Sequence, residues 1–101
     1  MAKFIAVHTL LKSPDEVMKA FGELSPPFAK VNASGKAPAK CIKTWNPIPH
    51  GRTDYVFCLW EAEHPKDVVL ALGKFLDYLT VDCVPVDEID WAEYAASLAH
   101  A

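Results

Sequence analysis

TDYVFCLWEAEHP, residues 53–65, is the stretch of sequence that decides the fold. Its middle, residues 55–62, is an almost unbroken apolar and aromatic run in which Glu61 carries the only charge. A run of this length, rich in Val, Phe, Tyr and Trp and bounded by Gly51 and Pro65, is typical of a strand buried on both faces. We therefore expect the other elements of the chain to cover the two faces of this strand.

A second interior strand is predicted at residues 4–11, FIAVHTLL, which is apolar apart from a histidine and a threonine. Side chains alternate along a strand, so one face of this strand is expected to carry Phe4, Ala6, His8 and Leu10. In the run 55–62, the same rule assigns one shared face to Val56, Cys58 and Trp60. Because both faces of both strands are apolar, we place the two strands in the interior of the sheet.

The helices are predicted from their start and stop signals. Ser13 is a suitable cap for a first helix, a proline follows it, and Glu16 closes a capping box. We expect this helix to end before Pro26 and Pro27, with residues 28–33 adding a further turn or two that ends at a glycine. A second helix is predicted over residues 66–72. A short amphipathic helix is predicted over residues 87–98.

Two more strands are predicted at the edges of the sheet. Residues 40–46 carry two lysines, and residues 79–84 carry an aspartate and end before Pro85. The order strand, helix, strand, strand, helix, strand is the split βαβ pattern, in which right-handed crossovers place the first and third strands in the centre. We therefore expect an α+β fold, a ferredoxin-like βαββαβ sandwich with a four-stranded antiparallel sheet and an extra C-terminal helix.

Two helices cover only one face of such a sheet. The other face is predicted to be apolar, and an exposed apolar face of this size promotes association. A second copy of the chain is the simplest cover for it, so we expect a homodimer formed through the open sheet face.

Composition limits the possible partners and the compartment. The 101 residues, 51% hydrophobic and 23% charged, indicate a single globular domain over residues 1–101. The net charge of −3 argues against binding to nucleic acid. No apolar stretch approaches the ~20 residues that span a membrane.

The cysteines and the N-terminus indicate the compartment. Cys41, Cys58 and Cys83 form no Cys-x-x-Cys pair, and the first residues lack the pattern of a signal peptide. We expect reduced thiols in a cytoplasmic protein.

The element order and three stretches carry a resemblance to a known superfamily. The stretches are FIAVHTL (4–10), VFCLWEAEHPKDVVLAL (56–72) and TVDCVPVDE (80–88). Over residues 3 to about 86 the chain resembles the dimeric α+β-barrel superfamily, in which two ferredoxin-like subunits pack sheet against sheet. The second stretch is similar to small uncharacterised bacterial families, one of which includes nickel-binding proteins. The superfamily spans haem-degrading monooxygenases, lactone isomerases, polyketide cyclases and simple binders, so the resemblance implies a fold and a dimer but no single reaction.

His8 is the most informative single residue, because a neutral imidazole inside an apolar strand needs a hydrogen-bond partner. Two interpretations stay open: a satisfied core histidine, or a base or ligand in a pocket. The second interpretation predicts a pocket between sheet and helices, lined by His8, Trp45, Cys58 and Trp60, that takes a small apolar or aromatic molecule. His8 is then the catalytic candidate, for proton transfer of the kind that isomerases and cyclases perform.

Two other function classes compete with this prediction. A thiolate and imidazole set of His8, Cys58 and Cys41 would suit a transition metal such as zinc, nickel or copper, although these residues lack the spacing of a chelating motif. Haem is not expected, since neither predicted helix interior contains a histidine. The third possibility is a purely structural association module. A phosphate-binding glycine loop and a serine nucleophile elbow are both missing from the sequence.

Overall fold

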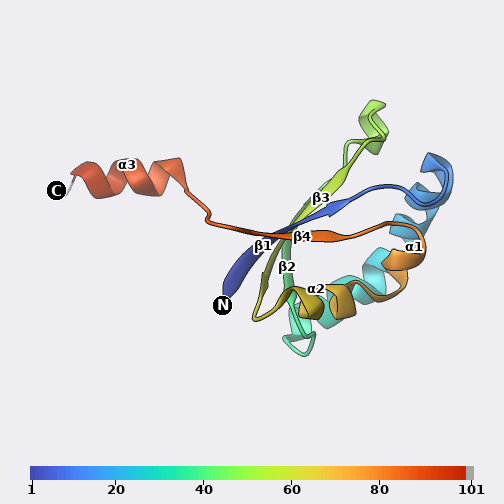
Figure 1. Cartoon of the computed structure of the whole chain (residues 1–101), viewed down its shortest axis with the longest axis horizontal. Helices are drawn as coiled ribbons and strands as arrows, with labels where there is room; N and C mark the ends of the chain where they lie inside the picture. Colours follow the sequence, from blue (N-terminus) through green and yellow to red (C-terminus); the bar gives the residue numbers. More distant parts are fainter. Residues whose placement is uncertain (100–101) are drawn as a thin grey trace.

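The structure is a computed structural model that describes residues 1–99, so His100 lies outside the described residues. Within them the chain forms an α+β fold, with one four-stranded antiparallel open sheet and three α-helices (Figure 1). The elements in chain order are β1 (Ala2–His8), α1 (Pro14–Ser34), β2 (Lys40–Trp45), the 3-10 turn η1 (Ile48–His50), β3 (Val56–Ala62), α2 (Pro65–Leu72), the 3-10 turn η2 (Gly73–Asp77), β4 (Asp82–Val86) and α3 (Trp91–Ala99).

The strand order is β2-β3-β1-β4. The two strands predicted to be interior are therefore the central pair, and the two that carry charges are at the edges. In the register of β1 against β3, Phe4 lies opposite Trp60 and Ala6 lies opposite Cys58. All four of these side chains are buried on one face of the sheet, as the alternation of the two strands predicts.

The helix α1 is longer than the sequence predicts. It begins as expected, with the Ser13 hydroxyl accepting a hydrogen bond from the amide of Glu16, but it continues through Pro26 and Pro27 as far as Ser34. The predicted stop at the prolines was wrong because tertiary contacts hold the second half of the helix. Phe28 packs edge-on against the rings of Trp60 and Phe75, and an asparagine one turn later bonds the backbone of β2.

The ends of two strands also differ from the prediction. β1 ends at His8, and beyond it only an isolated bridge joins Leu10 to Leu79. β4 covers residues 82–86 and contains Pro85, which was predicted to end it. A proline is compatible with this position because an edge strand has a neighbour on one side only, and therefore has backbone donors that need no strand partner.

The two faces of the sheet have different surroundings. The helices α1 and α2 lie against one face, where the core residues of β1 and β3 pack on Val68, Leu72 and Phe75 (Figure 1). The opposite face is left uncovered by the described elements. The third helix, α3, begins at Trp91 rather than at the predicted residue 87, and it projects away from the sheet and the other helices.

Candidate functional site

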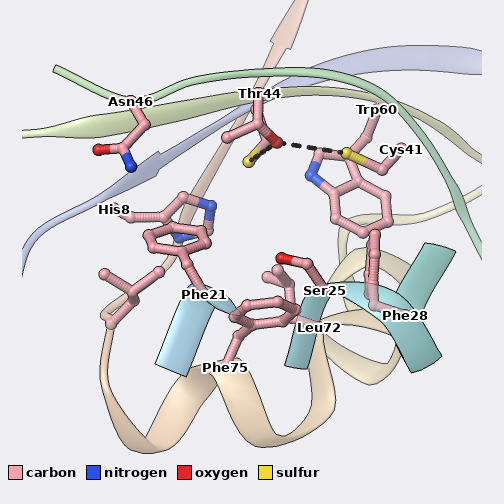
Figure 2. Close-up of a pocket in the computed structure, with 12 residues that line it drawn as sticks. His8, Phe21, Ser25, Phe28, Cys41, Thr44, Asn46, Trp60, Leu72 and Phe75 are labelled. Carbon is pink, nitrogen blue, oxygen red and sulfur yellow. Dashed lines mark hydrogen bonds between the residues drawn. The ribbon is translucent and has the colours of Figure 1, made fainter. Parts of the chain in front are cut away.

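A cavity of about 240 Å³ lies between the sheet and the helices (Figure 2). Most of its wall is apolar, and its polar side chains come from the strands, from α1 and from the residue after β2. The lining residues are His8, Phe21, Ser25, Phe28, Cys41, Thr44, Asn46, Cys58, Trp60, Leu72, Phe75 and Leu79. Ser25 on α1 and Thr44 on β2 are exposed, so the cavity reaches the surface between these two elements.

His8, at the end of β1, is fully buried, and its imidazole Nδ1 lies 2.7 Å from the carbonyl oxygen of Thr80. A carbonyl oxygen can only accept, so Nδ1 carries the proton and donates. The hydroxyl of Thr80 is fixed in turn by Thr9, whose amide and hydroxyl both bond to it at 2.8 and 2.7 Å. The neutral ring of His8 is therefore held in one tautomer, with a bare lone pair on Nε2.

The remaining ring nitrogen of His8 has no partner. Nε2 of His8 and Nε1 of Trp60 are the buried side-chain polar atoms of residues 1–99 that make no hydrogen bond. In Figure 2 the indole nitrogen of Trp60 is on the side of its ring that faces His8 across the cavity. Nε2 is an acceptor and the indole N–H is a donor, so the two unpaired atoms are chemically complementary.

Electrostatics keep the His8 ring neutral. Burial lowers the pKa of His8 because the apolar surroundings disfavour the imidazolium, and the bond to Thr80 opposes this only in part. The other residues of the cavity wall are uncharged apart from any ionisation of the two thiols. The cavity thus presents a neutral base and neutral donors, and a ligand would meet no fixed charge there.

The thiols of Cys41 and Cys58 both contact the hydroxyl of Thr44 in the cavity wall. The Sγ of Cys58 lies 3.1 Å from Oγ1 of Thr44, and the Sγ of Cys41 lies 3.9 Å from it (Figure 2). The pKa of Cys41 is lowered, chiefly by a hydrogen bond from the neighbouring Cys58 thiol. The pKa of Cys58 is raised by the same partner and by burial. If one of the pair ionises, it is Cys41.

Trp45 does not line this cavity, although the sequence predicted it there. Strict alternation from Cys41 would put Lys43 and Trp45 on the same face as Cys41. Instead a β-bulge lies between Cys41 and Lys43, so that Thr44 lies opposite Cys58 and Trp45 lies opposite Phe57. One extra residue exchanges the two faces of the strand beyond it. Trp45 is therefore half exposed on the open face of the sheet.

The structure brings His8, Cys41, Cys58 and Trp60 to one cavity. Residues 1–99 contain no group of three or more His, Cys, Asp or Glu side chains that could hold a metal ion. His50 and His64 lie outside the cavity, at the 3-10 turn before β3 and at the N-cap of α2.

Sequence reasoning missed the aromatic wall of the cavity. Phe21 and Phe28 come from α1 and Phe75 from η2, and their rings pack on one another. Nothing in the sequence marked an unfilled space beside these three rings. Thr44 was missed as well, because the bulge that turns it inward has no signal in the sequence.

Searches against protein-family models, curated proteins and solved structures found no match to this chain. Among the described residues, no helix has the length and apolar character needed to cross a lipid bilayer.

Proposed function

We propose that this protein binds a small uncharged molecule, about the size of one substituted ring, in the cavity beside His8. The observation that carries the proposal is the pair of unpaired, complementary nitrogens, Nε2 of His8 and Nε1 of Trp60. A buried polar group without a partner costs about 1–3 kcal/mol. A ligand with a hydroxyl for Nε2 and a carbonyl or ether oxygen for the indole N–H would recover both costs.

The size and the chemistry of the wall support a ring-shaped, neutral ligand. An apolar cavity of roughly 150 Å³ is enough to bind benzene, so about 240 Å³ allows a single ring with one or two small substituents. The rings of Phe21, Phe28 and Phe75 suit an aromatic or alicyclic body. A charged ligand is disfavoured, because no opposite fixed charge would compensate for its desolvation.

The same geometry would allow proton transfer. A neutral imidazole with a free Nε2 accepts a proton from a carbon or oxygen acid placed against it, and a nearby N–H can stabilise the oxyanion that forms. The bond from Nδ1 to Thr80 would then stabilise the imidazolium. We propose isomerase-like or cyclase-like chemistry on an enolisable carbonyl compound as the catalytic form of this binding function.

We further propose that the fold is ferredoxin-like and that the chain is a homodimer of the α+β-barrel type. The strand order, with β1 and β3 in the centre and one open face, supports this proposal. A cytoplasmic location is proposed on the basis of three free cysteines.

Trp60 offers a direct test of ligand binding, since it is fully buried beside the cavity while Trp45 and Trp91 are exposed. In a Trp45→Phe, Trp91→Phe background, Trp60 is the only tryptophan and reports on the cavity alone. Phenol should change its emission saturably and raise the melting temperature, because a ligand that binds only the folded state stabilises it. Toluene should bind more weakly, since it has no hydroxyl, and benzoate should be excluded by its charge. No change in emission or melting temperature with any neutral ring compound at millimolar concentration would refute the binding function.

A further inference from the structure

The C-terminal helix α3 has an apolar stripe that no part of residues 1–99 buries. None of its nine residues is buried. Trp91, Tyr94 and Leu98 are 69%, 52% and 59% exposed, and the helix projects beyond the sheet in Figure 1. Isolated helices shorter than ~12–15 residues are marginal in water, so a nine-residue helix needs a surface that covers its stripe.

The open face of the sheet is an exposed apolar surface that could cover the stripe of α3. It has a hollow to which Ile5, Ile42, Trp45 and Leu59 contribute apolar side chains. Of the thirteen large hydrophobic residues that are exposed in residues 1–99, eight belong either to this face or to the C-terminal segment. These eight are Ile42, Trp45, Tyr55 and Val84 on the face, and Ile89, Trp91, Tyr94 and Leu98 in the segment.

The helix lies away from the open face of its own chain (Figure 1). Glu88 forms an ion pair with Lys3 at 3.0 Å, which ties the chain to the sheet just after β4. Asp90 already caps α3, because its carboxylate accepts from the amides of Ala92 and Glu93. Ile89 is the only residue between Glu88 and the capped start of α3, so the connection from the sheet to the helix is short.

The distribution of charge also favours contact between the C-terminal segment of one copy and the open sheet face of another. Residues 87–101 contain four carboxylates and neither lysine nor arginine. The edge strand β2 carries Lys40 and Lys43, and neither forms an ion pair among residues 1–99. We propose that α3 is an exchanged arm: in a symmetric dimer, the α3 of each chain packs its apolar stripe onto the open sheet face of a second copy, near β2. This inference rests on the proposed homodimer through the open sheet face, and it places the arm of the second copy, instead of that copy's sheet, over the part of the face near β2.

Analytical ultracentrifugation of full-length chains tests the exchange. Wild type should sediment at twice the 11.2 kDa chain mass at micromolar concentration. An arm variant, Trp91→Ser with Leu98→Ser, and a face variant, Trp45→Ser, should each raise the dimer dissociation constant at least about tenfold, since each removes buried apolar area. Leu70→Ser is the matched control, because Leu70 is as exposed as the arm residues but lies on α2. It should leave the dissociation constant unchanged.

A mixture of the arm variant and the face variant tests whether the arm of one chain contacts the face of the other. Each variant alone has no intact contact between an arm and a face, but the mixed dimer has one, formed by the arm of the face variant on the face of the arm variant. The mixture should therefore dimerise more strongly than either variant alone. If only the face variant weakens a wild-type dimer, the sheets pack directly and the exchange is wrong while the homodimer stands. If only the arm variant weakens it, the arm packs elsewhere and the exchange is also wrong. A monomeric wild type would overturn both.

Discussion

The Nδ1 atom of His8 donates to the carbonyl oxygen of Thr80 at 2.7 Å, and this contact leaves Nε2 as the free, basic nitrogen of the ring. Because Thr80 is itself bonded to Thr9 on the neighbouring segment, the position of the carbonyl is fixed by the pairing of the chain around it. The orientation of the candidate base is thus a consequence of the fold and does not depend on a bound ligand.

Two substitutions of His8 separate its structural and functional roles. An asparagine amide can take the place of Nδ1 and a glutamine amide the place of Nε2. His8→Asn should keep the bond to Thr80, so that urea unfolding changes little, while phenol affinity falls about tenfold for the lost hydrogen bond. His8→Gln should lose the donor to Thr80 and cost about 1–3 kcal/mol of stability, with part of the binding retained. Equal losses of stability and unchanged binding in both variants would make His8 only a core histidine.

The lowered pKa of His8 predicts a pH dependence of stability. The folded pKa lies below the ordinary value of 6.5, so between these two values the unfolded chain binds more protons than the folded chain. Stability then increases with pH in that window. The contribution of His8 is complete above pH 6.5 and is lost as the pH falls towards the folded pKa. The stability of wild type relative to His8→Asn, measured by urea unfolding in steps from about pH 7.5 to 5.5, should therefore decrease. A constant or rising difference would show that burial does not depress this pKa.

Thiol reactivity should differ within the pair that shares Thr44. The lowered pKa of Cys41 increases its thiolate fraction, and the raised pKa of Cys58 decreases it. Peptide mapping after brief iodoacetamide treatment near pH 8 should find Cys41 labelled well before Cys58. Thr44→Val should slow the labelling of Cys41 by removing a donor to its thiolate, and Thr44→Ser should not. Faster labelling of Cys58 than of Cys41 would contradict this arrangement of the two thiols.

Much of the cavity follows from strand alternation. The apolar runs around His8 and Cys58 predicted two central strands, and the period of two placed His8, Cys58 and Trp60 on the covered face. These inferences hold because both strands are regular over their whole length and pair without a bulge. Edge strands and the C-terminal helix were found in the right order, with ends that differ by a few residues.

The rest depends on contacts between distant residues. The bulge at β2 turns Thr44 inward and Trp45 outward, and it is a property of the pairing with β3 rather than of either strand alone. The helix α1 continues through Pro26 and Pro27 because Phe28 packs against Trp60 and Phe75, which lie far along the chain. The unpaired nitrogens are likewise invisible in the sequence, since a missing partner is known only when all neighbours are in place.

Ligand binding in the cavity depends on Nε2 of His8 being an unprotonated acceptor that a ligand can reach. Long-range proton–nitrogen NMR correlation of ¹⁵N-labelled protein near pH 7.5, with and without phenol, observes both ring nitrogens of His8 directly. We predict a protonated Nδ1, an unprotonated Nε2 whose resonance moves to lower frequency as the phenol hydroxyl bonds to it, and no comparable movement with toluene. A proton on Nε2 in the free protein, or an Nε2 resonance that phenol at saturating concentration leaves in place, would show that Nε2 is not the acceptor for a ligand.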